Sequence, residues 1–107
     1  MRIELLYFDG CPSYRTLLPR LERLLGDAGV RDGVELRRVD SEQQATDERF
    51  LGSPTVRVNG ADVEAGADAR TDFGMKCRLY RGASGHSPIP PDKWIVASLR
   101  RAAGTTP

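Results

Sequence analysis

Two cysteines are the residues of this chain that most clearly offer chemistry. Cys11 lies in Asp9-Gly10-Cys11-Pro12, between an apolar run and a leucine-rich run, and Cys77 lies in Lys76-Cys77-Arg78. The thiolate is the reactive form of cysteine, both as a nucleophile toward disulfides and as a ligand for soft metal ions. These residue types predict thiol chemistry, with Cys11 as its centre.

Cys11 is expected at a turn between a strand and a helix. The apolar residues 3–8 have the composition of a buried strand, and the leucines of residues 17–25 recur at helical spacing. The helix is expected to begin at Pro12 or Ser13, because proline suits the first helical position. The free N–H groups and the positive dipole end of such a helix favour an anion and lower the pKa of a neighbouring thiol. The pattern therefore predicts a reactive thiolate at Cys11.

The remaining sequence predicts further alternating strands and helices. Residues 34–39 are expected to form a strand and 42–50 a helix capped by Asp40-Ser41, and Asn59-Gly60 predicts a hairpin between two short strands within 56–63. After that come a loop over 65–75, an extended segment over 76–81, a loop over 82–90, a helix over 91–103 and a frayed tail over 104–107. This order favours parallel pairing of the first two strands and antiparallel pairing of the last two.

Length and charge limit the classes of partner. The 107 residues predict one domain over 1–107, with a core in 2–66 and a C-terminal extended segment and helix in 76–103. With 16 Lys and Arg against 15 Asp and Glu, the net charge is +1, which gives no reason to expect nucleic acid or a membrane as partner. The polar N-terminus lacks the apolar region of a signal peptide, so a cytoplasmic location is expected. A monomer or a weak dimer is expected.

The order of elements and several motifs resemble the thioredoxin/glutaredoxin fold. Cys11-Pro12 at the first strand–helix turn is similar to the Cys-Gly-Pro-Cys and Cys-Pro-Tyr-Cys motifs of that superfamily. Pro54-Thr55 after a small residue resembles its cis-proline segment, and Ala65-Gly66 resembles the Gly-Gly after the glutaredoxin hairpin. The resemblance implies an α/β fold with a thioredoxin-like mixed β-sheet and flanking helices, in the order β-α-β-α-β-β-α, and a cis bond before Pro54.

The same resemblance implies a thiol–disulfide oxidoreductase in which Cys11 is the nucleophile. Its second redox cysteine would fall at Tyr14, so Cys11 must work alone, with a small thiol such as glutathione, or with Cys77. An extended thiol or disulfide substrate, small molecule or protein, would pair with the backbone beside Pro54. The residues expected to contact that substrate are Pro12, Ser13, Tyr14, Arg15, Pro54 and Thr55.

Cys77 has two interpretations that the sequence leaves open. It is either a functional partner that resolves the mixed disulfide on Cys11, or a buried small hydrophobe, the commonest state of a free cysteine. The arginines Arg78 and Arg81 are expected to pair with a carboxylate of the substrate or to form the polar face of a half-buried strand. Asp9 is expected to cap the turn or the helix start.

The FDGCP opening and the late Cys77-Arg78-Leu79-Tyr80 segment resemble small proteins labelled alkylmercury lyase. This resemblance implies an alternative function, the capture of a soft ion such as Hg²⁺ or Cu⁺, or of an organomercurial, by Cys11 and Cys77, with Asp9 as a third member. A zinc site is not expected, because two cysteines and one histidine are too few ligands. No resident cofactor is expected. A redox-inert interaction domain with two structural cysteines is a further alternative.

Overall fold

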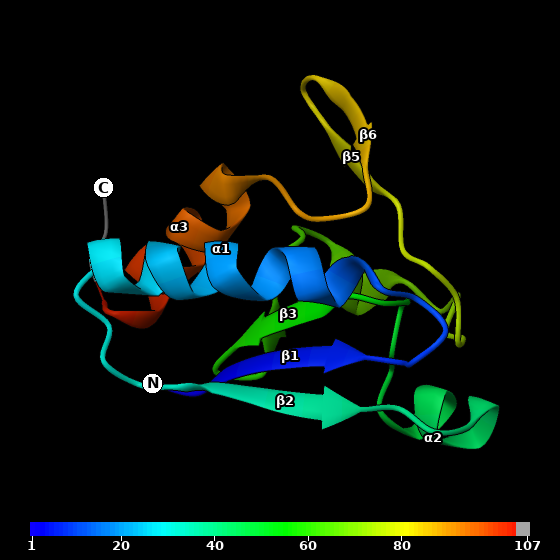
Figure 1. The fold of residues 1–107 in the computed structure, drawn as a ribbon. Coiled ribbons are helices and arrows are strands. Elements are labelled where there is room, and N and C mark those ends of the chain that lie inside the picture. The colour runs from blue at the N-terminus through cyan, green and yellow to red at the C-terminus, as the bar shows by residue number, and fades with distance from the viewer. Residues whose placement is uncertain (105–107) are drawn as a thin grey trace.

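The structure of the protein is a computed structural model that describes residues 1–104. It is a mixed α/β fold with a four-stranded mixed sheet in the order β2-β1-β3-β4 (Figure 1). The strands are β1 (Ile3–Tyr7), β2 (Val34–Arg38), β3 (Thr55–Val58) and β4 (Ala61–Asp62). As predicted, β1 pairs parallel with β2, and β3 pairs antiparallel with β4. The strand β3 is also antiparallel to β1, which was not predicted. Of the tail predicted over 104–107, residues 105–107 lie outside the described residues.

Two of the three helices cover one face of this sheet. Figure 1 shows α1 (Ser13–Asp27) and α3 (Asp92–Ala102) on the same side of the strands. Leucines of α1 are buried there, as their spacing predicted. They pack against alternate residues of β1 and β3 and against the buried face of α3. This core contains Leu17, Leu21, Leu24, Leu25, Ile3, Leu5, Val56, Val58, Ile95 and Leu99. The helix therefore holds its N-terminus, and Cys11 before it, against the end of β1.

The short helix α2 (Glu42–Asp47) is the one whose length the sequence overestimated. Its start is as predicted, because the Ser41 hydroxyl accepts a hydrogen bond from the backbone N–H of Gln44. Its end comes earlier than residue 50, because Arg49 adopts a positive φ of 55°, which no right-handed helix accommodates. Phe50 then turns back into a second small cluster with Leu6.

A second hairpin lies where a loop was predicted over residues 82–90. It consists of β5 (Tyr80–Gly82) and β6 (Gly85–Ser87), joined through Gly85 at φ 109°. Its second strand is polar and mostly exposed, so it lacks the alternation of apolar and polar residues that identifies a strand in sequence. This hairpin follows Cys77 directly and leads into α3.

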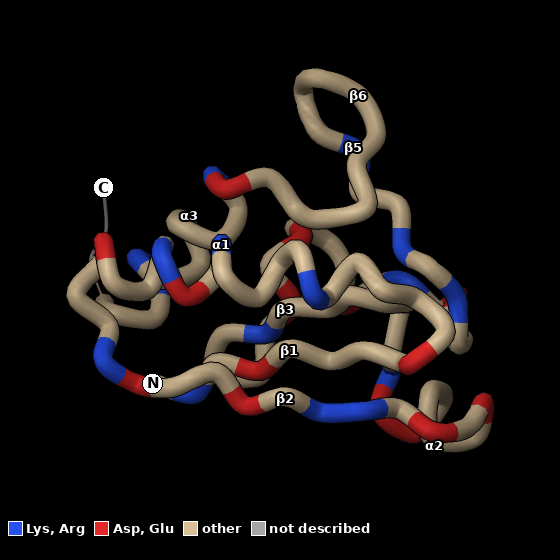
Figure 2. Tube along the Cα trace, in the orientation of Figure 1, with Lys and Arg blue, Asp and Glu red and all other residues tan. Residues whose placement is uncertain are grey.

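Charged residues of both signs are spread over most of residues 1–104, whereas the stretch 82–91 has none (Figure 2). One carboxylate, that of Glu4 on β1, is buried at 2% exposure on the sheet face away from α1. It accepts a 2.7 Å hydrogen bond from Arg37 on the neighbouring β2, which compensates its burial. Within residues 1–104, no helix has both the length and the apolar composition that crossing a membrane requires.

Candidate functional site

Cys11 and Cys77 are joined by a disulfide in the structure, with their Cα atoms 5.7 Å apart. The disulfide excludes a free Cys77, whereas the functional role that the sequence left open for Cys77 stays a prediction. The two residues differ in exposure, because Cys11 is 0% exposed whereas Cys77 lies at the surface. The interpretation of Cys77 as a buried small hydrophobe is wrong, since the 76–81 segment turns its odd-numbered residues outward.

The residue before the cis proline holds both cysteines in place. The Ser53–Pro54 peptide bond is cis, as the resemblance implied. The backbone of Ser53 pairs with the Cys77 segment: its N–H donates to the Lys76 carbonyl and its carbonyl accepts from the Arg78 N–H, each at 2.8 Å. The sulfur of Cys11 lies 3.5 Å from the same Ser53 carbonyl. Ser53 thus brings together two chain segments that are 66 residues apart in sequence.

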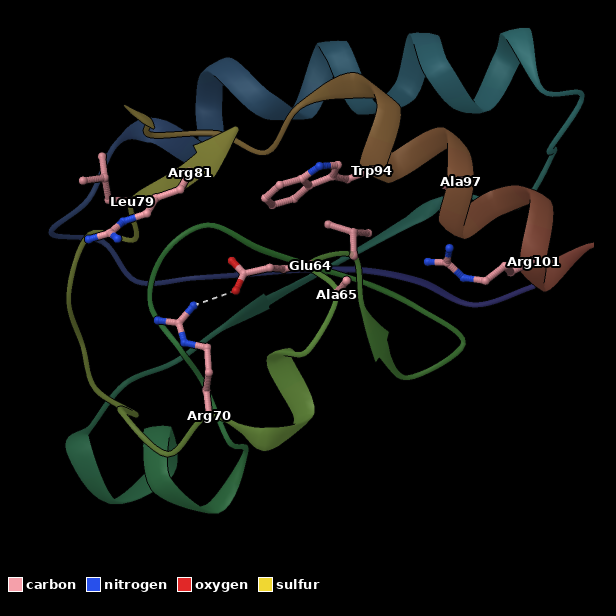
Figure 3. Close-up of a pocket in the computed structure, with 9 residues that line it drawn as sticks. Glu64, Ala65, Arg70, Leu79, Arg81, Trp94, Ala97 and Arg101 are labelled. Atoms are coloured by element: carbon pink, nitrogen blue, oxygen red, sulfur yellow. Dashed lines mark hydrogen bonds and ion pairs between the residues drawn. The ribbon is translucent and has the colours of Figure 1, made fainter. Parts of the chain in front are cut away.

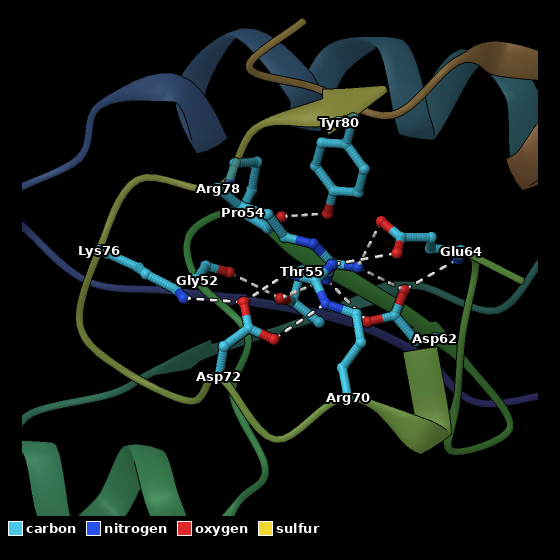
Figure 4. Close-up of polar contacts among 10 residues, drawn as sticks. All are labelled: Gly52, Pro54, Thr55, Asp62, Glu64, Arg70, Asp72, Lys76, Arg78 and Tyr80. Atoms are coloured by element: carbon cyan, nitrogen blue, oxygen red, sulfur yellow. Dashed lines mark hydrogen bonds and ion pairs between the residues drawn. The ribbon is translucent and has the colours of Figure 1, made fainter. Parts of the chain in front are cut away.

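A buried arginine anchors the residue next to Cys77. The Arg78 side chain is 1% exposed, and its guanidinium forms ion pairs with Asp62 at 2.7 Å and Glu64 at 3.2 Å. It also donates to the Thr55 hydroxyl at 3.0 Å and lies over the Tyr80 ring. We call Arg78 and these four partners the Arg78 cluster (Figure 4). Two carboxylates and a hydroxyl accept hydrogen bonds from the two Nη groups, which compensates the burial of the charge, whereas the buried Nε has no hydrogen-bond partner within residues 1–104.

Two members of the Arg78 cluster, Thr55 and Tyr80, link it to the cis-proline segment by hydrogen bonds. Thr55 follows Pro54 and bonds both Arg78 and the Gly52 carbonyl, and the Tyr80 hydroxyl donates to the Pro54 carbonyl (Figure 4). Burial raises the pKa of Tyr80, so its hydroxyl stays protonated and remains a donor. The segment around Cys77 is therefore fixed to Ser53-Pro54-Thr55 by both backbone and side-chain bonds.

A second, exposed set of ion pairs leads up to Cys77. Asp72 accepts hydrogen bonds from Arg70 and, at 3.0 Å, from Lys76, the residue before Cys77. These two cations hold the pKa of Asp72 well below its usual range. The Asp72 side chain is about half exposed, so this pair adds little stability compared with the buried Arg78 cluster.

Of the residues predicted from the sequence to contact a substrate, the structure brings one side chain to the sulfur. Ser13 Oγ lies 3.8 Å from the Cys11 sulfur at the start of α1. The Tyr14 ring stacks on Tyr7, with ring centres 4.0 Å apart, and the exposed Arg15 contacts Tyr14. The hydrogen bond that Arg15 donates to the Tyr14 hydroxyl raises the pKa of Arg15 above its ordinary value.

The other residues predicted to contact a substrate, Pro12, Pro54 and Thr55, differ in their exposure. Pro12 is exposed and caps α1 through its backbone, with no side-chain cap, so the expected capping of the helix start by Asp9 is wrong. Asp9 instead lies 3.5 Å from Arg38. Pro54 and Thr55 are buried.

Sequence reasoning missed Ser53 and the inward orientation of Arg78. Both alternatives considered for Arg78 placed it toward a substrate or on a polar face, but its partners are the chain's own Asp62 and Glu64. In the structure exposed and buried residues alternate over 77–81, with Arg78 and Tyr80 on the inner face. The sequence of this segment has no apolar–polar alternation that would place Arg78 there.

Gly52 is required where the Cys77 segment crosses the cis-proline loop. Its φ is +123°, and a Cβ there would meet the Arg78 Cβ and the Lys76 carbonyl oxygen at 3.0 Å each. We expect Gly52→Ala to lower the free energy of unfolding by about 2 kcal/mol in chemical denaturation. The control is Gly60→Ala, with φ +85° and no atom within 4 Å, which should cost about 1 kcal/mol. Equal losses would show that the close approach is unimportant.

No protein-family model matches this chain, and neither a curated protein nor a solved structure is significantly similar to it.

Proposed function

We propose that the protein is a thiol–disulfide oxidoreductase that uses the Cys11–Cys77 pair as its redox couple. The observation that carries the proposal is this disulfide, formed between a cysteine two residues before α1 and an exposed cysteine. A thioredoxin-like arrangement is part of the proposal. It is supported by the sheet order β2-β1-β3-β4 and by the cis bond before Pro54, beside the Cys11 sulfur.

The exposure of the two cysteines supports an order of events. An external thiolate reaches the sulfur of the exposed Cys77, forms a bond to it, and displaces Cys11 as a thiolate. Cys11 is a suitable leaving group, because the N-terminus of α1 favours a negative charge. A second external thiol then attacks the outer sulfur of the mixed disulfide and releases Cys77. Two external thiols are thereby oxidised to a disulfide, and the protein gains the two electrons and two protons.

These roles differ from those expected from the sequence, which gave the attack to Cys11 and the resolving step to Cys77. In the reverse direction proposed here, Cys77 attacks the external disulfide and Cys11 resolves the mixed disulfide. The backbone of Ser53 was expected to pair with an extended substrate, but in the oxidised protein it pairs with residues 76–78. A partner that binds the oxidised form therefore meets the exposed face of this segment.

The single-cysteine variants test the proposal. Cys11→Ser leaves the exposed Cys77 free, and we expect it to form a mixed disulfide with oxidised glutathione faster than Cys77→Ser, in which the remaining thiol is buried. The wild-type protein should convert reversibly between dithiol and disulfide in glutathione buffers, with intact mass as the readout. Faster reaction of Cys77→Ser would contradict the order of events. The absence of any reversible Cys11–Cys77 disulfide would contradict the function and favour a redox-inert domain.

The same pair of sulfurs supports a second candidate function, the capture of a soft metal ion or organomercurial as cargo. Reduction would leave two thiols on adjoining segments, and thiols that lose their protons to a metal are soft ligands that select soft ions. The parallel with organomercurial cleavage is weaker, because Asp9 is directed to Arg38. Within residues 1–104, no three His, Cys, Asp or Glu side chains gather as a metal site. Binding of one Hg²⁺ per reduced chain, lost in Cys77→Ser, would favour this candidate if redox exchange were absent.

A further inference from the structure

A cavity of about 660 Å³ opens beside the Cys77 segment, between α3, the chain just after β4, and β5 (Figure 3). Trp94, Ala97 and Arg101 line it from α3, Val63 lines it from the end of β4, and Arg81 lines it from β5. A volume of this size is typical of sites for small molecules. Neither cysteine lines the cavity, and Glu64 is the lining residue that it shares with the Arg78 cluster.

The cavity has an excess of positive charge. Arg70, Arg81 and Arg101 line it, with Glu64 as the carboxylate among the lining residues. Glu64 is already paired with Arg70 at 3.0 Å and with Arg78 at 3.2 Å. Within residues 1–104, Arg81 and Arg101 have no carboxylate within salt-bridge distance. The Arg101 guanidinium donates to the hydroxyl of Ser98 at 3.1 Å and retains free donors.

Beside Arg101 the cavity wall is apolar. Trp94 is half-buried, and its ring meets Tyr80 edge to face, with ring centres 6.1 Å apart. Because Tyr80 is itself bonded to Pro54, the indole rests on a fixed support. Figure 3 shows the Arg101 side chain extending toward the cavity, whereas the Arg81 side chain points away from Trp94, toward Leu79. A flat apolar surface beside the Arg101 guanidinium matches a ligand with an apolar body and an acidic end.

We propose that this cavity binds a small organic anion, an aromatic or similarly flat carboxylate, with its ring against Trp94 and a carboxylate on Arg101. This site is separate from the proposed redox function. It adjoins the disulfide, because Leu79 and Arg81 lie on the same exposed face of the 76–81 segment as Cys77. A bound ligand would therefore contact the segment that carries the exposed cysteine.

Terephthalate is a suitable probe, because it has a flat ring and two carboxylates but no thiol. Trp94 is the only tryptophan of the chain, so its fluorescence reports on the cavity. We expect saturable quenching when terephthalate is added to the oxidised protein, confirmed by calorimetry. Terephthalamide, which has the same shape without charge, and inorganic phosphate, which lacks the ring, should bind at least tenfold more weakly.

Matched arginine variants locate the site. Arg101→Gln should weaken terephthalate binding about tenfold, because it removes a charge-assisted pair. Arg100→Gln is the control, since Arg100 neighbours Arg101 on α3 but does not line the cavity. No saturable binding by calorimetry would overturn the proposal. So would equal weakening by Arg100→Gln, equal binding of phosphate, or equal binding of terephthalamide. The probe has no redox chemistry, so each result is independent of the proposed function.

Discussion

Reduction of the Cys11–Cys77 disulfide is expected to lower the free energy of unfolding by about 4 kcal/mol. The two cysteines are 66 residues apart, and a cross-link over such a distance removes much of the conformational entropy of the unfolded chain. An effect of this size is a large share of the stability of a small domain. Chemical denaturation of the oxidised and the reduced protein, followed by circular dichroism, measures it directly.

The double variant Cys11→Ser/Cys77→Ser is the control for this prediction. Without the cross-link, it should match the stability of the reduced wild-type protein and should not respond to reductant. If reductant destabilised the double variant as well, the effect would not come from the disulfide. A change below about 1 kcal/mol in the wild-type protein would show that the disulfide does not constrain the unfolded chain as the loop length requires.

The position of Cys11 could be predicted because it depends on local sequence. An apolar strand, a short turn and a leucine-periodic helix are each encoded within a few residues, and together they fix the place of the cysteine between them. The hairpin at Asn59-Gly60 was predicted for the same reason, since the turn type and the residues that favour it are adjacent. These are the parts of the fold in which local preference and tertiary packing agree.

The pairing of Cys11 with Cys77 could not be predicted, because it depends on distant residues. The path from Gly66 to Cys77 is fixed by Arg78, which is buried against Asp62 and Glu64 of another segment. Hydrophobicity alone would predict that Leu79 is buried and that Arg78 is exposed. The structure has Leu79 56% exposed and Arg78 3% exposed, because the two carboxylates compensate the guanidinium. Charge compensation of this kind leaves no periodic signal in the sequence.

The Arg78 cluster gives the second large expected effect. Arg78→Met is expected to lower the free energy of unfolding of the oxidised protein by about 3 kcal/mol, because it leaves Asp62 and Glu64 without their shared cation. The side chains of Asp62 and Glu64 are 13% and 18% exposed, so some water can reach them. The expected loss of unfolding free energy is therefore at the low end of the range for breaking a buried ion pair. Arg81→Met is the control, since Arg81 is exposed with no carboxylate partner within residues 1–104, and it should change the stability by less than about 0.5 kcal/mol.

Arg78→Met also tests whether Arg78 positions Cys77 beside Cys11 or only stabilises the fold. In the reduced protein nothing covalent holds Cys77 beside Cys11, so the Arg78 cluster and the Ser53 pairing must keep the two sulfurs close. Loss of Arg78 should then lower the equilibrium constant for forming the Cys11–Cys77 disulfide from oxidised glutathione, measured by intact mass in folded protein. Gly60→Ala, expected to destabilise the fold away from this segment, should leave that constant unchanged. If Arg78→Met lowered the stability but not the equilibrium constant, Ser53 alone would suffice to align the cysteines, and the cluster would serve only the fold.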